Sequence, residues 1–146
     1  MPAPLPSFHG HVPADRLYDT RHDMWVLRDG NAIVIGATSF GLHRARRVIG
    51  FTAKPLGAEV AIGRGLGTVE SGKTVLAVHA PVSFRLEQRN DEAEERPALI
   101  EHDPWGAGWM VRGTPLAWEE EVGQLVDAAG YIAHIRAVDP DAVIEP

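Results

Sequence analysis

The segment that most constrains the fold is residues 67–74, GTVESGKT, which matches the phosphate-binding pattern GxxxxGK[ST] at every position. Such a loop needs a helix directly after it, because the amide groups at the helix N-terminus hold the phosphates. The residues that follow, 74–82, instead contain three valines, and Pro81 would break a helix within about two turns. Glu70 would also bring a carboxylate toward the phosphates. The sequence therefore predicts a β-hairpin with Lys73 at its tip.

The two interpretations of this segment predict different functions. A phosphate loop would make the chain a nucleotide-binding enzyme, whereas a hairpin that presents one lysine suits a carrier of a covalently attached group. We find no apolar strand ending in aspartate that could hold Mg²⁺ for a nucleotide. A third interpretation, an ordinary surface lysine, stays open at this point.

Composition and charge argue against several classes of protein. The length of 146 residues and the 45% hydrophobic content are typical of one globular domain. The net charge of −6 argues against nucleic-acid binding. No apolar run approaches the roughly 18 residues of a membrane span, and the proline-rich N-terminus resembles neither a signal nor a transit peptide. The absence of cysteine excludes disulfides and fits a reducing compartment, so we expect a cytoplasmic protein.

Short strands and turns are expected over most of the chain, because fifteen glycines and eleven prolines are scattered along it. Strand-like runs are predicted at residues 24–27, 32–36, 48–53, 58–62, 66–70, 74–80, 82–89 and 109–111. Thr38 can cap a short helix that continues to about Arg47. The longest helix is predicted to begin at Thr114 and to close at Gly130.

Tryptophan and histidine residues give weaker signals. Trp109 and Trp118 are expected in the core, because they face apolar neighbours on a strand and a helix. His22 could help to form a site near the lysine, or it could be a structural histidine. No metal-like spacing is found among His79, His102 and His134. We therefore expect neither a metal site nor a catalytic residue.

Six motifs, in the right order, resemble those of glycine cleavage system H proteins. Their sequences are YDTRHDMWV (18–26), IGATSF (35–40), GTVESGK (67–73), APVS (80–83), PALIEHDPWGAGW (97–109) and LVDAAGY (125–131). The third resembles the family pattern GxVES[VT]K, whose lysine carries lipoate, and the fifth resembles PxL[IV]NxDP[YF]GxGW. The first has one residue more than the family pattern Y[ST]xxHxW[IV]. The resemblance extends from about Tyr18 to Ile135.

The resemblance implies a fold and a domain organisation. The fold is a mainly β barrel-sandwich hybrid of two small antiparallel sheets, with a short helix in the N-terminal half and a C-terminal helix. The carrier domain would span residues 18–136. An extended proline-rich tail, 1–17, would precede it, and a frayed acidic tail, 137–146, would follow it.

The resemblance also implies a carrier rather than an enzyme. Lipoate would be joined to Lys73 by an amide bond, and Glu70, Ser71 and Gly72 would complete the attachment hairpin. The expected partners are a lipoate attachment enzyme and three glycine cleavage enzymes, namely the decarboxylase, the aminomethyltransferase and dihydrolipoyl dehydrogenase. In H proteins the lipoyl arm carries an aminomethyl group between these enzymes. We expect a monomer.

Three features depart from the family pattern. Arg44, Arg46 and Arg47 crowd the region after the first helix, where the family has an acidic residue. Phe84 replaces a glycine eleven residues after the lysine, and Gly72 replaces a β-branched residue. These departures predict weaker docking to glycine decarboxylase. Two alternatives follow: a lipoate-binding protein of a heterodisulfide-reductase-like sulfur oxidation system, or an H-like interaction module that carries no lipoate.

Overall fold

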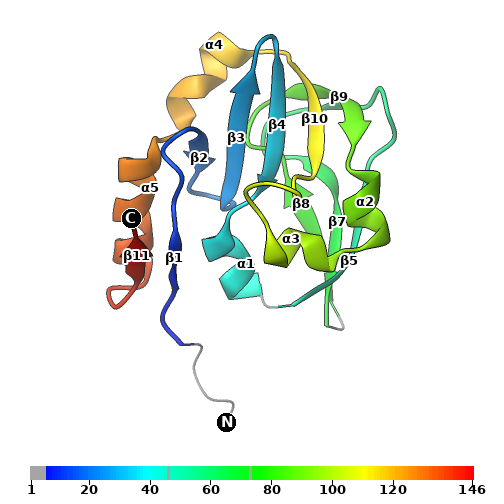
Figure 1. The fold of residues 1–146 in the computed structure, drawn as a ribbon. Coiled ribbons are helices and arrows are strands. Elements are labelled where there is room, and N and C mark those ends of the chain that lie inside the picture. Colours follow the sequence, from blue (N-terminus) through cyan, green and yellow to red (C-terminus); the bar gives the residue numbers. More distant parts are fainter. Residues whose placement is uncertain (1–5, 46, 73) are drawn as a thin grey trace.

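Strands make up most of the regular structure of the chain, which the computed structural model describes over residues 6–45, 47–72 and 74–146 (Figure 1). The strands are β1 (His9–His11), β2 (Leu17–Asp19), β3 (Met24–Asp29), β4 (Ala32–Ala37), β5 (Val48–Ala53), β6 (Glu59–Val60), β7 (Gly65–Ser71), β8 (Thr74–His79), β9 (Phe84–Arg89), β10 (Val111–Pro115) and β11 (Val143–Glu145). The helices are α1 (Ser39–Ala45), α2 (Asp91–Glu95), α3 (Ala98–His102), α4 (Trp118–Glu121), the 3₁₀ turn η1 (Val122–Gln124) and α5 (Ala128–Val138). Within the described residues, no helix is long and apolar enough to cross a membrane.

Two antiparallel sheets form the body of the molecule. The larger sheet has the strand order β2-β3-β4-β10-β9-β6, and the smaller sheet has the order β5-β7-β8. Buried side chains from both sheets meet in one apolar cluster, so the sheets share a core. They do not close into a barrel, but the arrangement is compatible with a barrel-sandwich hybrid. The predicted fold class is confirmed.

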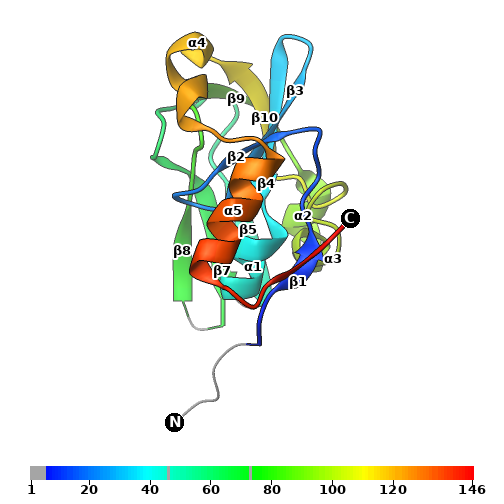
Figure 2. The same cartoon turned by 90° about the vertical axis from the view of Figure 1, so that its left-hand side faces the viewer.

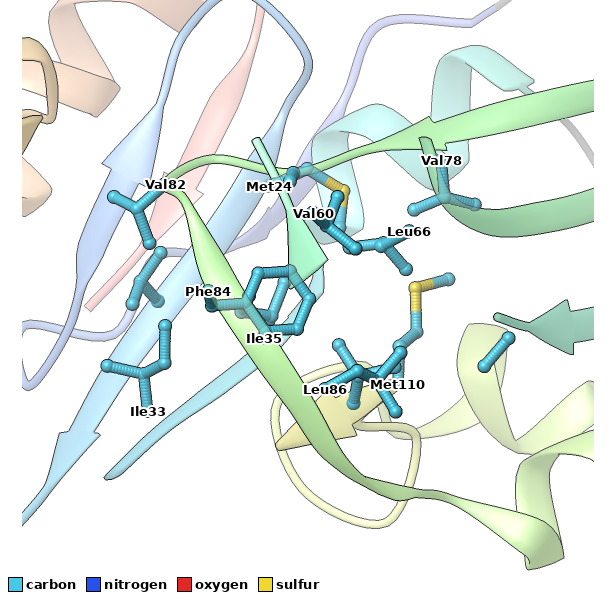
Figure 3. Packing of buried hydrophobic residues seen from close by; sticks show 14 of the residues in the cluster. Met24, Ile33, Ile35, Val60, Leu66, Val78, Val82, Phe84, Leu86 and Met110 are labelled. Atoms are coloured by element: carbon cyan, nitrogen blue, oxygen red, sulfur yellow. The ribbon is translucent and has the colours of Figure 1, made fainter. Parts of the chain in front are cut away.

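The ring of Phe84 lies within this shared core (Figure 3). Ile33 and Ile35 of β4 and Leu66 of β7 belong to the same cluster, and none of the four side chains is exposed to solvent. Phe84 is the first residue of β9, which pairs with β6 and β10. The prediction that this aromatic ring alters a docking surface beside the lysine hairpin is therefore wrong, because the ring faces the interior.

The C-terminal helix begins later than the sequence predicts. Thr114 belongs to β10, which lies between β4 and β9, so sheet pairing overrides the helix-capping signal of Thr-Pro. The residues that follow form only the short α4 and η1. The longest helix, α5, starts after Asp127, whose side chain accepts a 2.9 Å hydrogen bond from the backbone N–H of Gly130. Gly130 thus lies in the first turn of a helix rather than at its end.

The tryptophans predicted for the core lie at its edges. Trp118 is half-buried against the cluster between the sheets, and Trp109 is half-buried against a second apolar cluster. The fully buried tryptophan is Trp25, whose indole N–H donates a 3.0 Å hydrogen bond to the carbonyl of Pro104. The buried indole ring thus contributes a large apolar surface to the core without leaving its N–H unpaired.

The two tails that the sequence predicts to be loose or frayed pair with each other. β1 and β11 form a parallel ribbon in which His9 lies opposite Val143, and the ribbon lies beside α5 (Figures 1 and 2). Phe8 and Val12 are buried in the second apolar cluster together with Phe40 of α1. Backbone pairing and apolar burial therefore hold both segments, although the division into a carrier domain and two tails stays a prediction.

Candidate functional site

The hairpin of β7 and β8 is the first component of the site. Pairing continues to Ser71, opposite Thr74, so the chain reverses between these two residues. Gly72 has a φ of 63°, which glycine adopts without strain and which two-residue hairpin turns require. A strand follows the turn, so the hairpin prediction is confirmed and the phosphate-loop interpretation is wrong. Lys73 itself lies outside the described residues.

Contacts near the turn tie the hairpin to its neighbours. The Ser71 hydroxyl donates a 2.6 Å hydrogen bond to the carbonyl of Ala45, the last residue of α1. Glu70 is exposed and lies over Gly50 of β5, where an added Cβ would come within 3.3 Å of the glutamate Cδ. At the other end of α1, the Thr38 hydroxyl accepts a 3.0 Å hydrogen bond from the backbone N–H of Gly41. The hairpin and α1 are therefore held together.

An apolar groove of about 170 Å³ opens between the hairpin and α1. Its apolar lining consists of Met24, Ala37, Leu42, Ala45, Val48, Val69, Leu76, Ala77, Val78 and Met110. Ser71 lines the groove at the hairpin, and three titratable residues, His22, Asp23 and His79, complete the polar part of the lining. The groove thus leads from the predicted attachment site toward a small polar cluster.

Asp23 is the carboxylate of the groove. Its Oδ1 accepts a 2.7 Å hydrogen bond from the Tyr131 hydroxyl, while Arg44 and His134 nitrogens lie 3.7 and 3.9 Å from its oxygens. Burial raises the pKa of Asp23, and burial also raises the pKa of Tyr131. Asp23 has a φ of 56°, which is uncommon outside glycine. The surrounding donors therefore counter its charge within the protein.

His22 and His79 form a stacked pair in the groove. Their ring centroids are 4.4 Å apart, with 24° between the ring planes. His22 Nδ1 lies 2.9 Å from a carboxylate oxygen of Asp19, and His79 Nδ1 lies 2.9 Å from the carbonyl oxygen of Gly63. The sequence left the role of His22 open and gave none to His79, because no spacing shows that two distant segments place these rings in contact.

The arginines predicted to crowd this region have different surroundings. Arg44 lies 3.7 Å from Asp23, while its side chain stays largely exposed to solvent. Arg47 is exposed, and Arg46 lies outside the described residues. Over residues 6–45, 47–72 and 74–146, no group of three or more His, Cys, Asp or Glu side chains could hold a metal ion.

Comparison with known proteins identifies the family of the chain. A family model described as glycine cleavage H-protein matches residues 16–138. The chain belongs to the glycine cleavage H-protein family. A glycine cleavage system H protein of Mycolicibacterium smegmatis is 38% identical over 125 residues, which cover 84% of this chain and 95% of that protein. An H protein of Carboxydothermus hydrogenoformans is 33% identical over 120 residues, covering 82% and 91%.

A solved structure of this family shares the fold. The crystal structure of a glycine cleavage system H protein from Mycobacterium marinum superimposes with a TM-score of 0.72 at 31% sequence identity, and covers 83% of this chain and 96% of that one. Both terminal strands, β1 and β11, lie outside the residues that the family model matches. The ribbon of β1 and β11 is therefore not part of the region that the family model describes.

As a glycine cleavage H-protein, the chain is a lipoyl carrier and not an enzyme, and its cofactor is lipoate attached covalently to lysine. The groove fits such a group, because its apolar walls suit an aliphatic arm and begin at Ser71, two residues before Lys73. The glycine cleavage relatives favour this function over the sulfur oxidation alternative and over a module that carries no lipoate.

Proposed function

We propose that Lys73 carries the lipoyl group and that the groove beside the hairpin receives the arm. The observation that carries this proposal is the reversal of the chain between Ser71 and Thr74, which brackets position 73. An amine at a hairpin tip can enter the pocket of an attachment enzyme, whereas an amine within a sheet could not. Amide formation removes the positive charge of the lysine, so the arm can enter an apolar groove without burying an ion.

The neighbouring residues have separate roles in this proposal. Gly72 supplies the positive φ of the turn, and Ser71 fixes the hairpin to α1 through its bond to Ala45. Glu70 is exposed on the outer face of the smaller sheet, where its carboxylate is available to an attachment enzyme. None of the three is placed in a catalytic role, because the chemistry belongs to the partner enzymes.

The proposed partners are a lipoate attachment enzyme and the three enzymes of glycine cleavage: the decarboxylase, the aminomethyltransferase and dihydrolipoyl dehydrogenase. The names of the family and of its relatives support this set. We further propose that the protein is a monomer and that it is cytoplasmic. The absence of cysteine supports the second proposal, because it fits a reducing compartment. Light scattering after size-exclusion chromatography measures the oligomeric state directly.

Peptide mapping tests the attachment site. Protein co-expressed with a lipoate ligase should show one lipoyl adduct by intact mass, and the adduct should map to Lys73. The chain contains one other lysine, Lys54, which is exposed and serves as the internal control. Lys73→Arg keeps the charge and should abolish the adduct while the thermal unfolding curve stays the same. An adduct on Lys54, or none in the wild-type chain, would contradict the proposal.

A further inference from the structure

The hydrogen bonds of His22 and His79 determine which ring nitrogen of each carries the hydrogen. A carbonyl oxygen only accepts hydrogen bonds, so the contact between His79 Nδ1 and Gly63 requires a hydrogen on Nδ1. The carboxylate of Asp19 imposes the same tautomer on His22. Each neutral ring therefore has an Nε2 lone pair that can accept a proton. Among the residues that the structure describes, neither Nε2 has a hydrogen-bond partner.

His22 has the surroundings of a general base. Asp19, whose side chain is 9% exposed, holds Nδ1 of His22 on one side, and the ring of His79 covers one of its faces. A histidine fixed in this way by a carboxylate is the arrangement that activates hydroxyl or thiol nucleophiles in enzymes. The groove itself supplies no such nucleophile: the chain has no cysteine, and the Ser71 hydroxyl is bonded to Ala45.

The other charged groups around the groove are already engaged. Asp23 accepts a hydrogen bond from Tyr131 and faces Arg44 and His134. Arg21 lines a small polar pocket that also borders His22, and its guanidinium donates to the Gln124 side chain. The stacked rings are nearly parallel, so their lone pairs do not converge on one point as a shared metal ion would require. The pair is thus suited to a proton and not to a metal.

We propose that His22 is the base for the reduced lipoyl arm, with Asp19 and His79 as its positioning residues. Nε2 of His22 accepts the proton of a dihydrolipoyl thiol, and the sulfur keeps the electron pair of the broken S–H bond. An imidazolium forms beside Asp19, the net charge of the groove is unchanged, and no electron is transferred. This inference rests on the proposed attachment of lipoate to Lys73.

Two opposing influences act on the pKa of the dihydrolipoyl thiol. Burial of a thiolate in an apolar groove raises the pKa of the thiol, whereas a neighbouring imidazolium lowers it. When the imidazole is removed, only the effect of burial remains. The thiol of a His22→Gln variant should therefore ionise at higher pH than the thiol of the wild-type protein, however strongly burial acts on it.

Alkylation of the reduced arm tests this proposal. Lipoylated protein is reduced, treated with iodoacetamide over a range of pH, and followed by intact mass. We expect the midpoint of the rate profile to lie about one pH unit higher in His22→Gln, which near neutral pH corresponds to a roughly tenfold slower reaction. Asp19→Asn should shift the midpoint in the same direction, and His102→Gln, an exposed histidine on α3, should leave it unchanged.

A measurement on the wild-type chain does not depend on how the variants fold. The NMR titration of His22 should differ between the oxidised and the reduced arm, because only the reduced arm has a thiol proton to exchange with Nε2. Identical titrations, or equal alkylation midpoints in wild type and His22→Gln, would overturn the inference. A missing adduct at Lys73 would instead overturn the proposed function, so the two failures are distinguishable.

Discussion

Phe84 is an interior residue, so its substitution should affect stability. Its side chain is fully buried between the sheets, and truncation of a buried phenylalanine typically costs about 3–5 kcal/mol. We expect Phe84→Ala to lower the free energy of unfolding by this amount in urea denaturation. The exposed Val75 of β8 is the control, since Val75→Ala should change stability by less than about 0.5 kcal/mol. A loss below about 1 kcal/mol for Phe84→Ala would place the ring outside the core.

Asp23 should make stability depend on pH. Burial raises its pKa above the unfolded value of roughly 3.9, so its contribution to stability is complete below that value and is lost as pH rises through the folded pKa. Asparagine would keep an acceptor for Tyr131 and tolerate the positive φ, but it does not ionise. Asp23→Asn should therefore gain stability relative to wild type as pH rises above the unfolded pKa.

Chemical denaturation at several pH values measures this difference. Asp141→Asn is the matched control, because Asp141 is exposed and its side chain makes no hydrogen bond to the described residues. If the free energy of unfolding of wild type instead exceeds that of Asp23→Asn by an amount that grows with pH, the ion pairs with Arg44 and His134 outweigh burial, contrary to our expectation.

The residues of the site differ in how far local sequence reveals them. Glu70, Ser71 and Gly72 lie in one continuous run, so the turn chemistry and the motif were enough to predict the hairpin. The groove includes residues of the turn after β2, of α1 and of β8, segments that only the tertiary fold brings together. The pairing of His22 with His79 was therefore beyond any argument from spacing.

At the scale of elements, local capping signals competed with sheet pairing. Thr-Pro at 114–115 is the helix start that the sequence predicts, whereas Asp127 is the residue that caps α5 in the structure. The first lies in β10, which exchanges backbone hydrogen bonds with β4 and β9, and only the second begins a helix. Pairing partners distant in sequence decided the outcome, whereas α1 and the β3–β4 and β7–β8 hairpins followed their local signals.

The ribbon of β1 and β11 should stabilise α1, which forms one wall of the groove. The ring of Phe8 packs edge-on against Phe40 of α1 at 5.3 Å, and its backbone N–H donates a 2.7 Å hydrogen bond to Asp139. Phe8→Ala should lower the free energy of unfolding by about 3 kcal/mol and speed amide exchange in α1. Val143→Ala, at an exposed position of the same ribbon, should do neither. Unchanged exchange in α1 would show that the ribbon and the groove wall are independent.

At the scale of the whole molecule, the reasons to expect poor docking to glycine decarboxylase are weakened. Phe84 is internal, and Arg44 is engaged by Asp23. We therefore expect glycine–bicarbonate exchange with a reconstituted decarboxylase to proceed within a few-fold of the rate with the Mycolicibacterium smegmatis H protein at equal lipoylation. Arg47→Glu tests the contribution of one exposed arginine of this region through the salt dependence of the rate. A rate lower by two orders of magnitude would restore the sequence-based prediction of a different partner.

The parallel ribbon also determines how the molecule responds to a mechanical load. β1 and β11 run in the same direction, with His9 opposite Val143 and His11 opposite Glu145. Opposite pulls on the N-terminal side of β1 and the C-terminal side of β11 would slide the two strands past each other, so their hydrogen bonds would be strained together and not one after another. The chain should therefore resist stretching from its ends in shear, while the β7–β8 hairpin carries none of the force.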